Sequence, residues 1–341
     1  MSSKTSRRLL ALCVAVLGLP IDMHGQDGDG VKHGIVFGNA PSVAGIRFTF
    51  RDTERVRRTA GVHVSVWSPK EGVTGANVTG LTLGLPVAGG NELHGLTLGV
   101  FGAGANHEVT GISVGGLGIG AGGNVGGIAI GGLGIGSGGG LRGIAIGGLG
   151  AATGGDVRGL AIGGLGVGAG GDARGILVGG LGAGAGGSVR GLAVGGLGVG
   201  AGGGLHGIAI GGLGVGTGGD LSGIAIGGLG VGSGGELRGL AIGGLGVGAP
   251  KIHGTAIAPM VGAKDMWTPV SVSALMRQNV DGHFRGFSVS GVHAMRGTQH
   301  GLVLGIVNYA HTLDGVQVGV INIARNARMK VMPVMNVARA K

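Results

Sequence analysis

The chain has 341 residues, of which 91 are glycine and 8 are proline, and its formal net charge is +10. The glycines do not fall on every third residue, which excludes a collagen triple helix, and a composition of 43% hydrophobic and 12% charged residues argues against simple disorder. Aromatic residues make up 3% of the chain, too few for the base stacking that single-stranded nucleic acids require, so no specific nucleic-acid partner is predicted.

Residues 1–25 have the pattern of a cleaved secretory signal. Three basic residues precede the apolar stretch Leu9–Leu19, which is too short to span a bilayer, and cleavage is expected near Gly25. The only cysteine, Cys13, lies inside this stretch, so the mature chain is predicted to have no disulfide and no Cys-ligated metal. Removal of the signal leaves a net charge of +8, which favours acidic partners without specificity.

Residues 26–94 are predicted to form a β capping region. Gly45–Phe50 (GIRFTF) and Gly61–Trp67 (GVHVSVW) alternate like strands on either side of the charged segment Arg51–Arg58, which predicts a hairpin. Gly80–Val87 resembles a degenerate copy of the unit that follows. Repeat arrays need atypical terminal units, so we expect this region to cap the array.

Residues 95–250 form a repeat array with a fixed period. Nearly the same phrase opens every sixteen residues, as in GLAIGGLGVGAGGDAR for Gly159–Arg174, and an invariant period indicates one small unit stacked many times. The ten period glycines are Gly95, Gly111, Gly127, Gly143, Gly159, Gly175, Gly191, Gly207, Gly223 and Gly239.

Each unit is predicted to be β rather than helical. The unit Gly159–Arg174 holds seven glycines, and at roughly 1 kcal/mol each a helix would be strongly disfavoured. Leu160 and Ile162 alternate with Ala161, so one strand face carries branched residues and the other only Gly or Ala. Bends are expected at the Gly-Gly pairs.

This pattern fits a β-solenoid (β-roll) of about ten 16-residue Gly-rich coils, with less regular β caps at both ends. The solenoid is favoured because coil stacking does not tolerate insertions. We expect its stacked core to contain Leu160, Ile162, Leu165 and Val167. The alternatives are an antiparallel β-barrel of the outer membrane and an antiparallel meander in which Gly163–Gly164 forms a hairpin turn.

Residues 251–341 are expected to form irregular C-terminal β repeats and a cap. Repeat fragments persist at Gly286 (GFSVSG), Gly301 and Gly315, and the tail Met329–Lys341 is predicted to form a final strand or cap. Gly301–Asn308 (GLVLGIVN) and Gly315–Asn322 (GVQVGVIN) resemble the GLQLGLVN…GVQIGLIN phrase of a bacterial surface-repeat family, known from spirochaetes and other Gram-negative bacteria. The resemblance implies an exported or surface-associated protein.

The GIAIGG phrase at Gly143, Gly207 and Gly223 is similar, more loosely, to the SVAIG repeat of trimeric autotransporter adhesin heads, which form a left-handed β-roll. Those heads repeat near fourteen residues, and this chain lacks their heptad stalk and anchor domain. The resemblance therefore does not imply a trimer.

The sequence predicts no catalytic, cofactor or metal site. Gly166–Gly171 (GVGAGG) matches a dinucleotide fingerprint, but the match recurs in nearly every unit and no helix can follow it. Asp156, Asp172, Asp220 and Glu236 share one repeat position, but calcium needs six to eight oxygens, and these carboxylates are interpreted as turn formers. The C-terminal histidines lack zinc-ligand spacing, and Ser288 and Ser290 lie in no nucleophile elbow.

Another repeat position carries arginine in five units and predicts a basic stripe along one edge of the stacked coils. Two interpretations stay open: protection and solubility of the edge, or a ladder that binds regularly spaced phosphates or acidic sugars. The candidate polyanion-binding residues are Arg142, Arg158, Arg174, Arg190 and Arg238.

Together these features predict a non-enzymatic exported repeat protein that acts as a cell-envelope or surface scaffold, with adhesion or polyanion binding as its role. Its expected location is the cell surface, outer membrane or periplasm of a Gram-negative bacterium. The expected partner is an anionic envelope polysaccharide or lipid, and self-association and a protein partner are left open. The alternative functions are an integral outer-membrane barrel and an enzyme with its site in the irregular C-terminal part.

Overall fold

The computed structural model describes residues 21–22, 30–67 and 75–339. The predicted signal and its cleavage site fall almost entirely outside these residues. Within the described part the regular elements are strands, and none of it forms a helix long and apolar enough to cross a membrane. The chain divides into two compact units, Met1–Gly154 and Gly155–Lys341.

Successive repeats pair as parallel strands in register, which confirms a β-solenoid. In the second unit β13 (Val157–Gly163) pairs parallel with β15 (Ala173–Gly179), and Gly159 lies opposite Gly175. The first unit repeats this pattern, with Gly127 opposite Gly143. The antiparallel alternatives, barrel and meander, are therefore wrong for this array.

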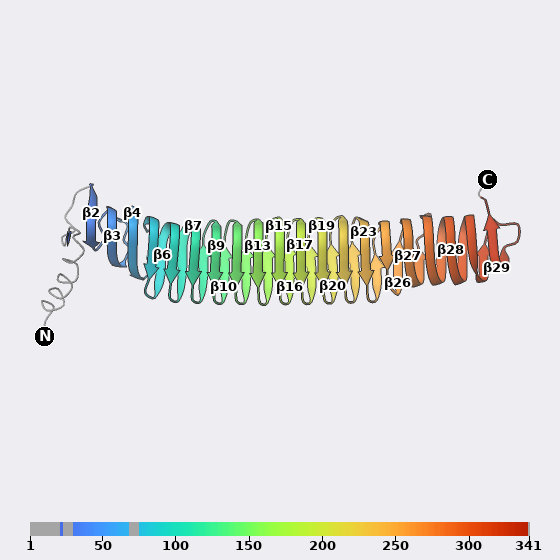
Figure 1. Cartoon of the computed structure of the whole chain (residues 1–341). Coiled ribbons are helices and arrows are strands. Elements are labelled where there is room, and N and C mark those ends of the chain that lie inside the picture. Colours follow the sequence, from blue (N-terminus) through green and yellow to red (C-terminus); the bar gives the residue numbers. More distant parts are fainter. Residues whose placement is uncertain (1–20, 23–29, 68–74, 340–341) are drawn as a thin grey trace. The chain divides into compact units, whose positions relative to one another are not determined.

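From β9 (Val125–Gly131) to β22 (Gly230–Ser233) each coil contains one seven-residue strand and one four-residue strand, and the two kinds alternate along the chain (Figure 1). Strands of the same kind stack on one another, as β14 (Gly166–Ala169) does on β16 (Gly182–Ala185). Each unit therefore has a long-strand sheet and a short-strand sheet, joined at the Gly-Gly turns.

The strands of the first unit are β1 (Ile21–Asp22), β2 (Val31–Phe37), β3 (Ser42–Arg51), β4 (Arg58–Trp67), β5 (Asn77–Gly84), β6 (Val87–Gly99), β7 (Gly102–Gly115), β8 (Gly118–Ala121), β9 (Val125–Gly131), β10 (Gly134–Ser137), β11 (Leu141–Gly147) and β12 (Gly150–Thr153).

The strands of the second unit are β13, β14, β15, β16, β17 (Val189–Gly195), β18 (Gly198–Ala201), β19 (Leu205–Gly211), β20 (Gly214–Thr217), β21 (Leu221–Gly227), β22 (Gly230–Ser233), β23 (Glu236–Gly243), β24 (Gly246–Gly248), β25 (Lys251–Ile257), β26 (Met260–Ala263), β27 (Asp265–Gln278), β28 (His283–Ala324) and β29 (Val331–Ala338).

The period glycine is fixed by its backbone conformation and by its neighbour in the preceding coil. Gly191 has φ of +122°, a region that other L-residues rarely adopt, and a Cβ there would lie 2.2 Å from the carbonyl oxygen of Gly175. The stacked coils thus bend at a column in which only glycine fits. This column explains why a glycine recurs in every coil.

The core is filled by the smaller residues of each coil, contrary to the expected inward set. Ala161 and Val167 are buried, whereas Leu165 is 50% exposed. Leu160 and Ile162 lie on the same outer face as exposed Ile176 of the next coil. Of the four side chains expected inside, only Val167 is confirmed as a buried core residue.

The close approach of the two sheets explains this reversal. Gly179, at the end of a long strand, faces inward, and a Cβ there would lie 1.9 Å from the carbonyl oxygen of Gly182 on the short strand. The space between the sheets therefore holds Gly, Ala and two columns of larger residues, one on the long strands, as at Leu205, and one on the short strands, as at Val167. Where Leu177 enters this core, its neighbours Ala173 and Ala183 are small, which keeps the packed volume nearly constant.

The coil architecture extends beyond the repeat array on the N-terminal side, where the predicted hairpin is wrong. β3 and β4 pair parallel, with Gly45 opposite Gly61. These two glycines are one 16-residue coil apart and both have positive φ, so the segment between the strands connects two coils. Local alternation predicted the strands correctly but carried no information on their direction.

The C-terminal end closes differently. β28 pairs parallel with β27, as in the preceding coils. β29 turns back and pairs antiparallel with β28, so that Val316 of β28 lies opposite Val337 of β29. This confirms the predicted final strand. An antiparallel cap pairs the last sheet edge, which would otherwise offer free backbone groups to another chain.

Candidate functional site

The carboxylates of the repeat form cross-coil hydrogen bonds. Asp156 Oδ1 accepts from the backbone N–H of Asp172 at 2.9 Å, and Asp172 Oδ1 accepts from that of Ser188 at 2.9 Å. These bonds lower the pKa of both aspartates, the nearby arginines adding to the effect. Ser188 Oγ accepts from the backbone N–H of Gly204 in the same way, which explains why Ser can replace Asp at this position.

No group of three or more His, Cys, Asp or Glu side chains in the described part of the chain could hold a metal ion. The aspartates of the repeat instead join each coil to the next.

The candidate arginines lie on the same edge, two residues after the carboxylates, and three of them are paired. Arg158 contacts Asp156 at 3.0 Å, and Arg174 contacts Asp172 at 3.3 Å. Arg238 pairs with Glu236, which raises the pKa of the arginine. In the coils of Arg142 and Arg190 the matching positions are Gly140 and Ser188, which carry no charge. In the second unit the register places Arg158, Arg174 and Arg190 opposite one another, beside a row of carboxylates, whereas the first unit contains only Arg142 of the five candidates.

The charge of the repeat array is balanced, and the positive charge lies elsewhere. Residues 95–250 contain the five candidate arginines and five acidic residues. Residues 251–341 contain ten Lys and Arg against three Asp and Glu, a net charge of +7. Attraction to an anionic surface is therefore strongest in the C-terminal part, outside the repeat array.

The outer face of the long-strand sheet is aliphatic. In the second unit Ile208 is 42% exposed and Ile210 is 38% exposed, on a strand whose inward residues are Leu205 and Ala209. Outward side chains at the two equivalent positions of each coil are Leu, Ile or Val throughout the array. Sequence analysis missed this surface because it assigned the same side chains to the core.

The first unit has a shallow apolar groove on this kind of face. Its volume is about 230 Å³, and it includes the outward ends of neighbouring long strands. The residues that line it are Leu83, Gly84, Leu85, Leu98, Gly99, Val100 and Val114. It lacks polar side chains that could orient a small substrate, and its shape suits hydrocarbon.

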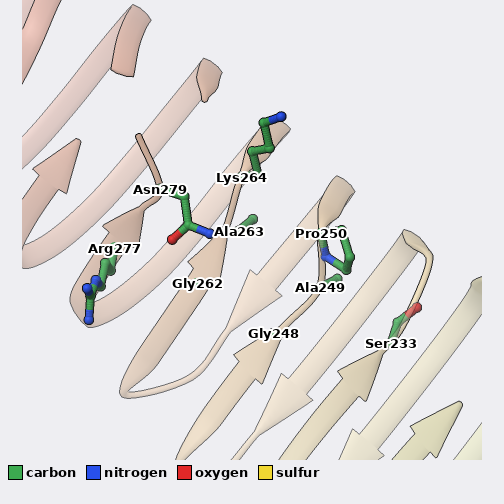
Figure 2. A pocket seen from close by; sticks show the side chains of 9 residues that line it. All are labelled: Ser233, Gly248, Ala249, Pro250, Gly262, Ala263, Lys264, Arg277 and Asn279. Carbon is green, nitrogen blue, oxygen red and sulfur yellow. The ribbon is translucent and has the colours of Figure 1, made fainter. Parts of the chain in front are cut away.

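A second depression, of about 720 Å³, lies in the second unit where the Gly-Gly turns give way to Ala249–Pro250 (Figure 2). Its cations do not converge: Figure 2 shows Lys264 and Arg277 at opposite ends and pointing away from each other, with Asn279 between them. A ligand in this open depression would meet no focused set of charged groups.

A buried polar cluster lies in the first unit. Asp52 accepts hydrogen bonds from Thr49 and from the backbone N–H of Ala76, each at 3.2 Å, and lies 3.3 Å from Nε2 of His63. Burial opposes ionisation of Asp52, but His63, buried Arg47 and the Ala76 N–H together lower its pKa. Burial also lowers the pKa of Arg47. The cluster has no access to solvent and is a charged part of the core.

A second polar network, in the C-terminal coils, has the order of a hydrolase triad. His293 Nε2 lies 2.9 Å from Ser288 Oγ, and its Nδ1 lies 2.7 Å from Asn308 Oδ1. Asn308 in turn donates to Asn322 Oδ1 at 2.7 Å. Sequence reasoning missed this network, because Ser288 and His293 meet across the interior of one coil and the asparagines come from the two coils that follow.

The network is sealed in the core, because Ser288, His293 and Asn308 have no exposed surface. Burial lowers the pKa of His293 to about 4, so the ring is neutral near pH 7. No substrate can reach Ser288 in this conformation. We interpret the network as an internal hydrogen-bond ladder, in which the asparagines of the two GxxxGxxN phrases stack on each other.

Comparison with models of protein families, with curated proteins and with solved structures found no match for this chain.

Proposed function

We propose that this protein is a non-enzymatic, exported scaffold of the Gram-negative cell envelope, and that it rests on an anionic lipid surface through the outer face of its long-strand sheet. The observation that carries the proposal is the inside-out distribution of side chains. In each repeat coil the core contains Gly and Ala beside its few larger residues, while Leu, Ile and Val occupy the outside.

An aliphatic outer face is unfavourable in water and favourable at a lipid boundary. Antiparallel and mixed sheets that face water usually alternate apolar inward and polar outward residues. Here both alternating sets are apolar, and the outward set remains partly exposed, as at Ile208 and Ile224. Each half-exposed aliphatic side chain would contribute roughly 1 kcal/mol when transferred out of water.

Electrostatics supports an anionic rather than a neutral surface. Residues 251–341 carry a net charge of +7, and basic residues near an anionic membrane contribute about 1 kcal/mol each. The repeat array, with balanced charges, adds apolar contact without repulsion. The resemblance to bacterial surface repeats, the predicted signal and the absence of cysteine after Cys13 support an extracytoplasmic location.

The test is co-sedimentation of the full chain with vesicles of phosphatidylglycerol and phosphatidylcholine, compared with vesicles of phosphatidylcholine alone. We expect binding that depends on phosphatidylglycerol and is weakened at least tenfold by the double substitution Ile208→Gln and Ile224→Gln. Both side chains are partly exposed, so the coil should stay folded. The control places glutamine at Leu213 and Leu229, which are exposed in the turns before the short strands and lie outside the long-strand sheet. Equal binding by the Ile208/Ile224 variant and the unmodified chain would refute the lipid contact.

A further inference from the structure

The outer face of the short-strand sheet carries glycines that the fold of a single chain does not require. A Cβ placed on Gly168, Gly200 or Gly216 would have no atom within 4 Å, and these residues lack the positive φ of the period glycines. In the first unit Ala152 occupies the position opposite Gly136 and is exposed. The position therefore accepts a side chain, yet the second unit keeps glycine there in each repeat coil.

Other glycines of the same coils differ sharply from these. A Cβ on Gly180, at the turn, would lie 1.8 Å from the carbonyl oxygen of Gly164. Packing within the chain thus explains the turn glycines. We name the glycines on the outer face of the short strands the glycine floor. Packing within the chain leaves five of them without an internal cause, because a Cβ there would meet nothing within 4 Å: Gly168, Gly200, Gly216, Gly232 and Gly248. A Cβ on Gly184 would lie 3.1 Å from the carbonyl oxygen of Gly200, and a Cβ on the first glycine of each short strand would lie 3.3–3.7 Å from the next coil. The floor of the second unit comprises Gly166, Gly168, Gly182, Gly184, Gly198, Gly200, Gly214, Gly216, Gly230, Gly232, Gly246 and Gly248.

A row of leucines runs beside the glycine floor. One leucine precedes each short strand, and its side chain is 49–60% exposed in every repeat coil of the second unit. We name this row the leucine ridge: Leu165, Leu181, Leu197, Leu213, Leu229 and Leu245. A ridge of bulky side chains next to a floor without side chains is a shape that can fit a copy of itself.

The ridge and floor carry no charge. In the repeat coils of the second unit the charged residues are confined to the edge of Asp156 and Arg158 and their equivalents. Charge enters the floor column only at Arg277, which lies opposite Gly262. Exposed sheets usually carry charges that prevent association, and this face lacks them between Gly166 and Gly248.

We infer that a second copy of this chain covers this face, with the leucine ridge of each copy lying on the glycine floor of the other. A two-fold axis that lies in the plane of the interface, parallel to the direction in which the coils stack, produces this arrangement and makes the interface self-complementary. Both copies have the same 16-residue coil and the same strand spacing, so every leucine meets an equivalent site. A side chain on the glycine floor would keep the two copies apart. The interface therefore explains the glycines that packing within one chain does not require.

The size of the face agrees with a specific dimer. Six coils at ~4.8 Å and a short strand with its leucine at ~3.3 Å per residue give roughly 29 by 16 Å. Two such faces bury on the order of 1,000 Å², about where specific interfaces begin. A lipid surface would explain the leucines but not the floor, because larger apolar side chains would then increase the contact. This inference is independent of the lipid proposal, which uses the other sheet.

The test is sedimentation equilibrium of the purified full chain, which has a mass of 32.6 kDa. We expect a dimer at micromolar concentration. The double substitution Gly168→Glu and Gly216→Glu places two charges on the floor, where open space accepts them, and should raise the dimer dissociation constant at least tenfold. Circular dichroism and the melting temperature of the isolated variant check that the coils remain folded.

A matched pair of cysteine variants locates the interface. In a Cys13→Ser background, Gly200→Cys should give a covalent dimer with a short bis-maleimide, whereas Ile208→Cys, on the opposite sheet, should not. The Ile208→Gln and Ile224→Gln variant should dimerise normally even where it fails to bind vesicles. A monomeric unmodified chain, a dimer that tolerates the glutamates, or cross-linking through Ile208 alone would each overturn the inference.

Discussion

The residue type at a repeat position depends on its neighbours in the preceding and following coils. The period glycine must be glycine because its counterpart in the preceding coil occupies the space of a Cβ. Asp156 and Asp172 are turn residues whose oxygens hold the following coil. The same logic applies to the C-terminal network, where His293 is held between Ser288 and Asn308 from neighbouring coils.

His293 should make the stability of the second unit depend on pH. Its pKa falls from an ordinary value of 6.5 to about 4 in the folded chain, chiefly because of burial, so protonation favours the unfolded state. The contribution is fully present above pH 6.5 and is lost as pH falls from 6.5 towards 4. We expect about 2 kcal/mol of destabilisation between pH 7 and pH 5.

The measurement is urea unfolding at both pH values for the unmodified chain and for His293→Gln, which removes the titrating group. The variant should start less stable but lose this pH dependence. A slope that survives the substitution would assign it to other groups.

At the scale of the element, the strands of a coil must keep the same side chains pointing inward, whereas the number of residues in its turns can vary. Along the repeat array the coils have sixteen residues, but Gly61 and Gly80 are nineteen apart and still lie opposite each other. The invariance of the array therefore reflects its repeated turn geometry, while strand alternation is the stricter constraint.

A pair of insertions separates these two constraints. One alanine after Val167 should turn the rest of β14 inside out and expel Ala169 from the core. One alanine after Gly171 should disturb only the turn, where Gly171 donates to Gly155 at 3.0 Å and Gly187 donates to Gly171 at 2.9 Å. At about 1 kcal/mol per hydrogen bond, the turn insertion should cost about 2 kcal/mol and the strand insertion clearly more.

Thermal unfolding followed by circular dichroism compares the two insertions directly. Equal losses in melting temperature would contradict the assigned strand and turn boundaries.

For the whole molecule, the distribution of charge decides which surfaces can meet which partners. The repeat coils confine their charges to one edge and balance them, while residues 251–341 hold most of the positive charge. The arginine column remains a predicted polyanion contact. Its neighbouring acids weaken it, because Arg158 and Arg174 are already paired.

Removing three arginines from this edge tests the column. The triple substitution Arg158→Ser, Arg174→Ser and Arg190→Ser leaves the acids unbalanced, so the salt concentration that elutes the protein from heparin or lipopolysaccharide should fall. The matched control replaces the same residues with lysine, which keeps the charge and should keep the elution position. Identical elution of the serine and lysine variants would exclude the column as a binding element.

How much the sequence predicts can be judged from particular residues. The alternation of Leu160, Ala161 and Ile162 correctly indicates a strand, and the invariant period correctly favours stacked coils over hairpins. The direction of β4 relative to β3 could not be read from alternation, because parallel and antiparallel strands share the same period of two. The Ser288–His293–Asn308 network was equally hidden, since Ser288 and His293 meet only when one coil folds on itself and Asn308 joins them from the next coil.

The sequence by itself determined the period, the strands and the bending points, because these depend on local backbone conformation and on the absence of side chains at fixed positions. Only the tertiary structure decided which strand face is the inside. An alternating strand has two equally regular faces, and local pattern cannot choose between them. The two sheets approach so closely that Gly179 and its equivalents face inward without a side chain, and this contact sends the large aliphatic residues outward.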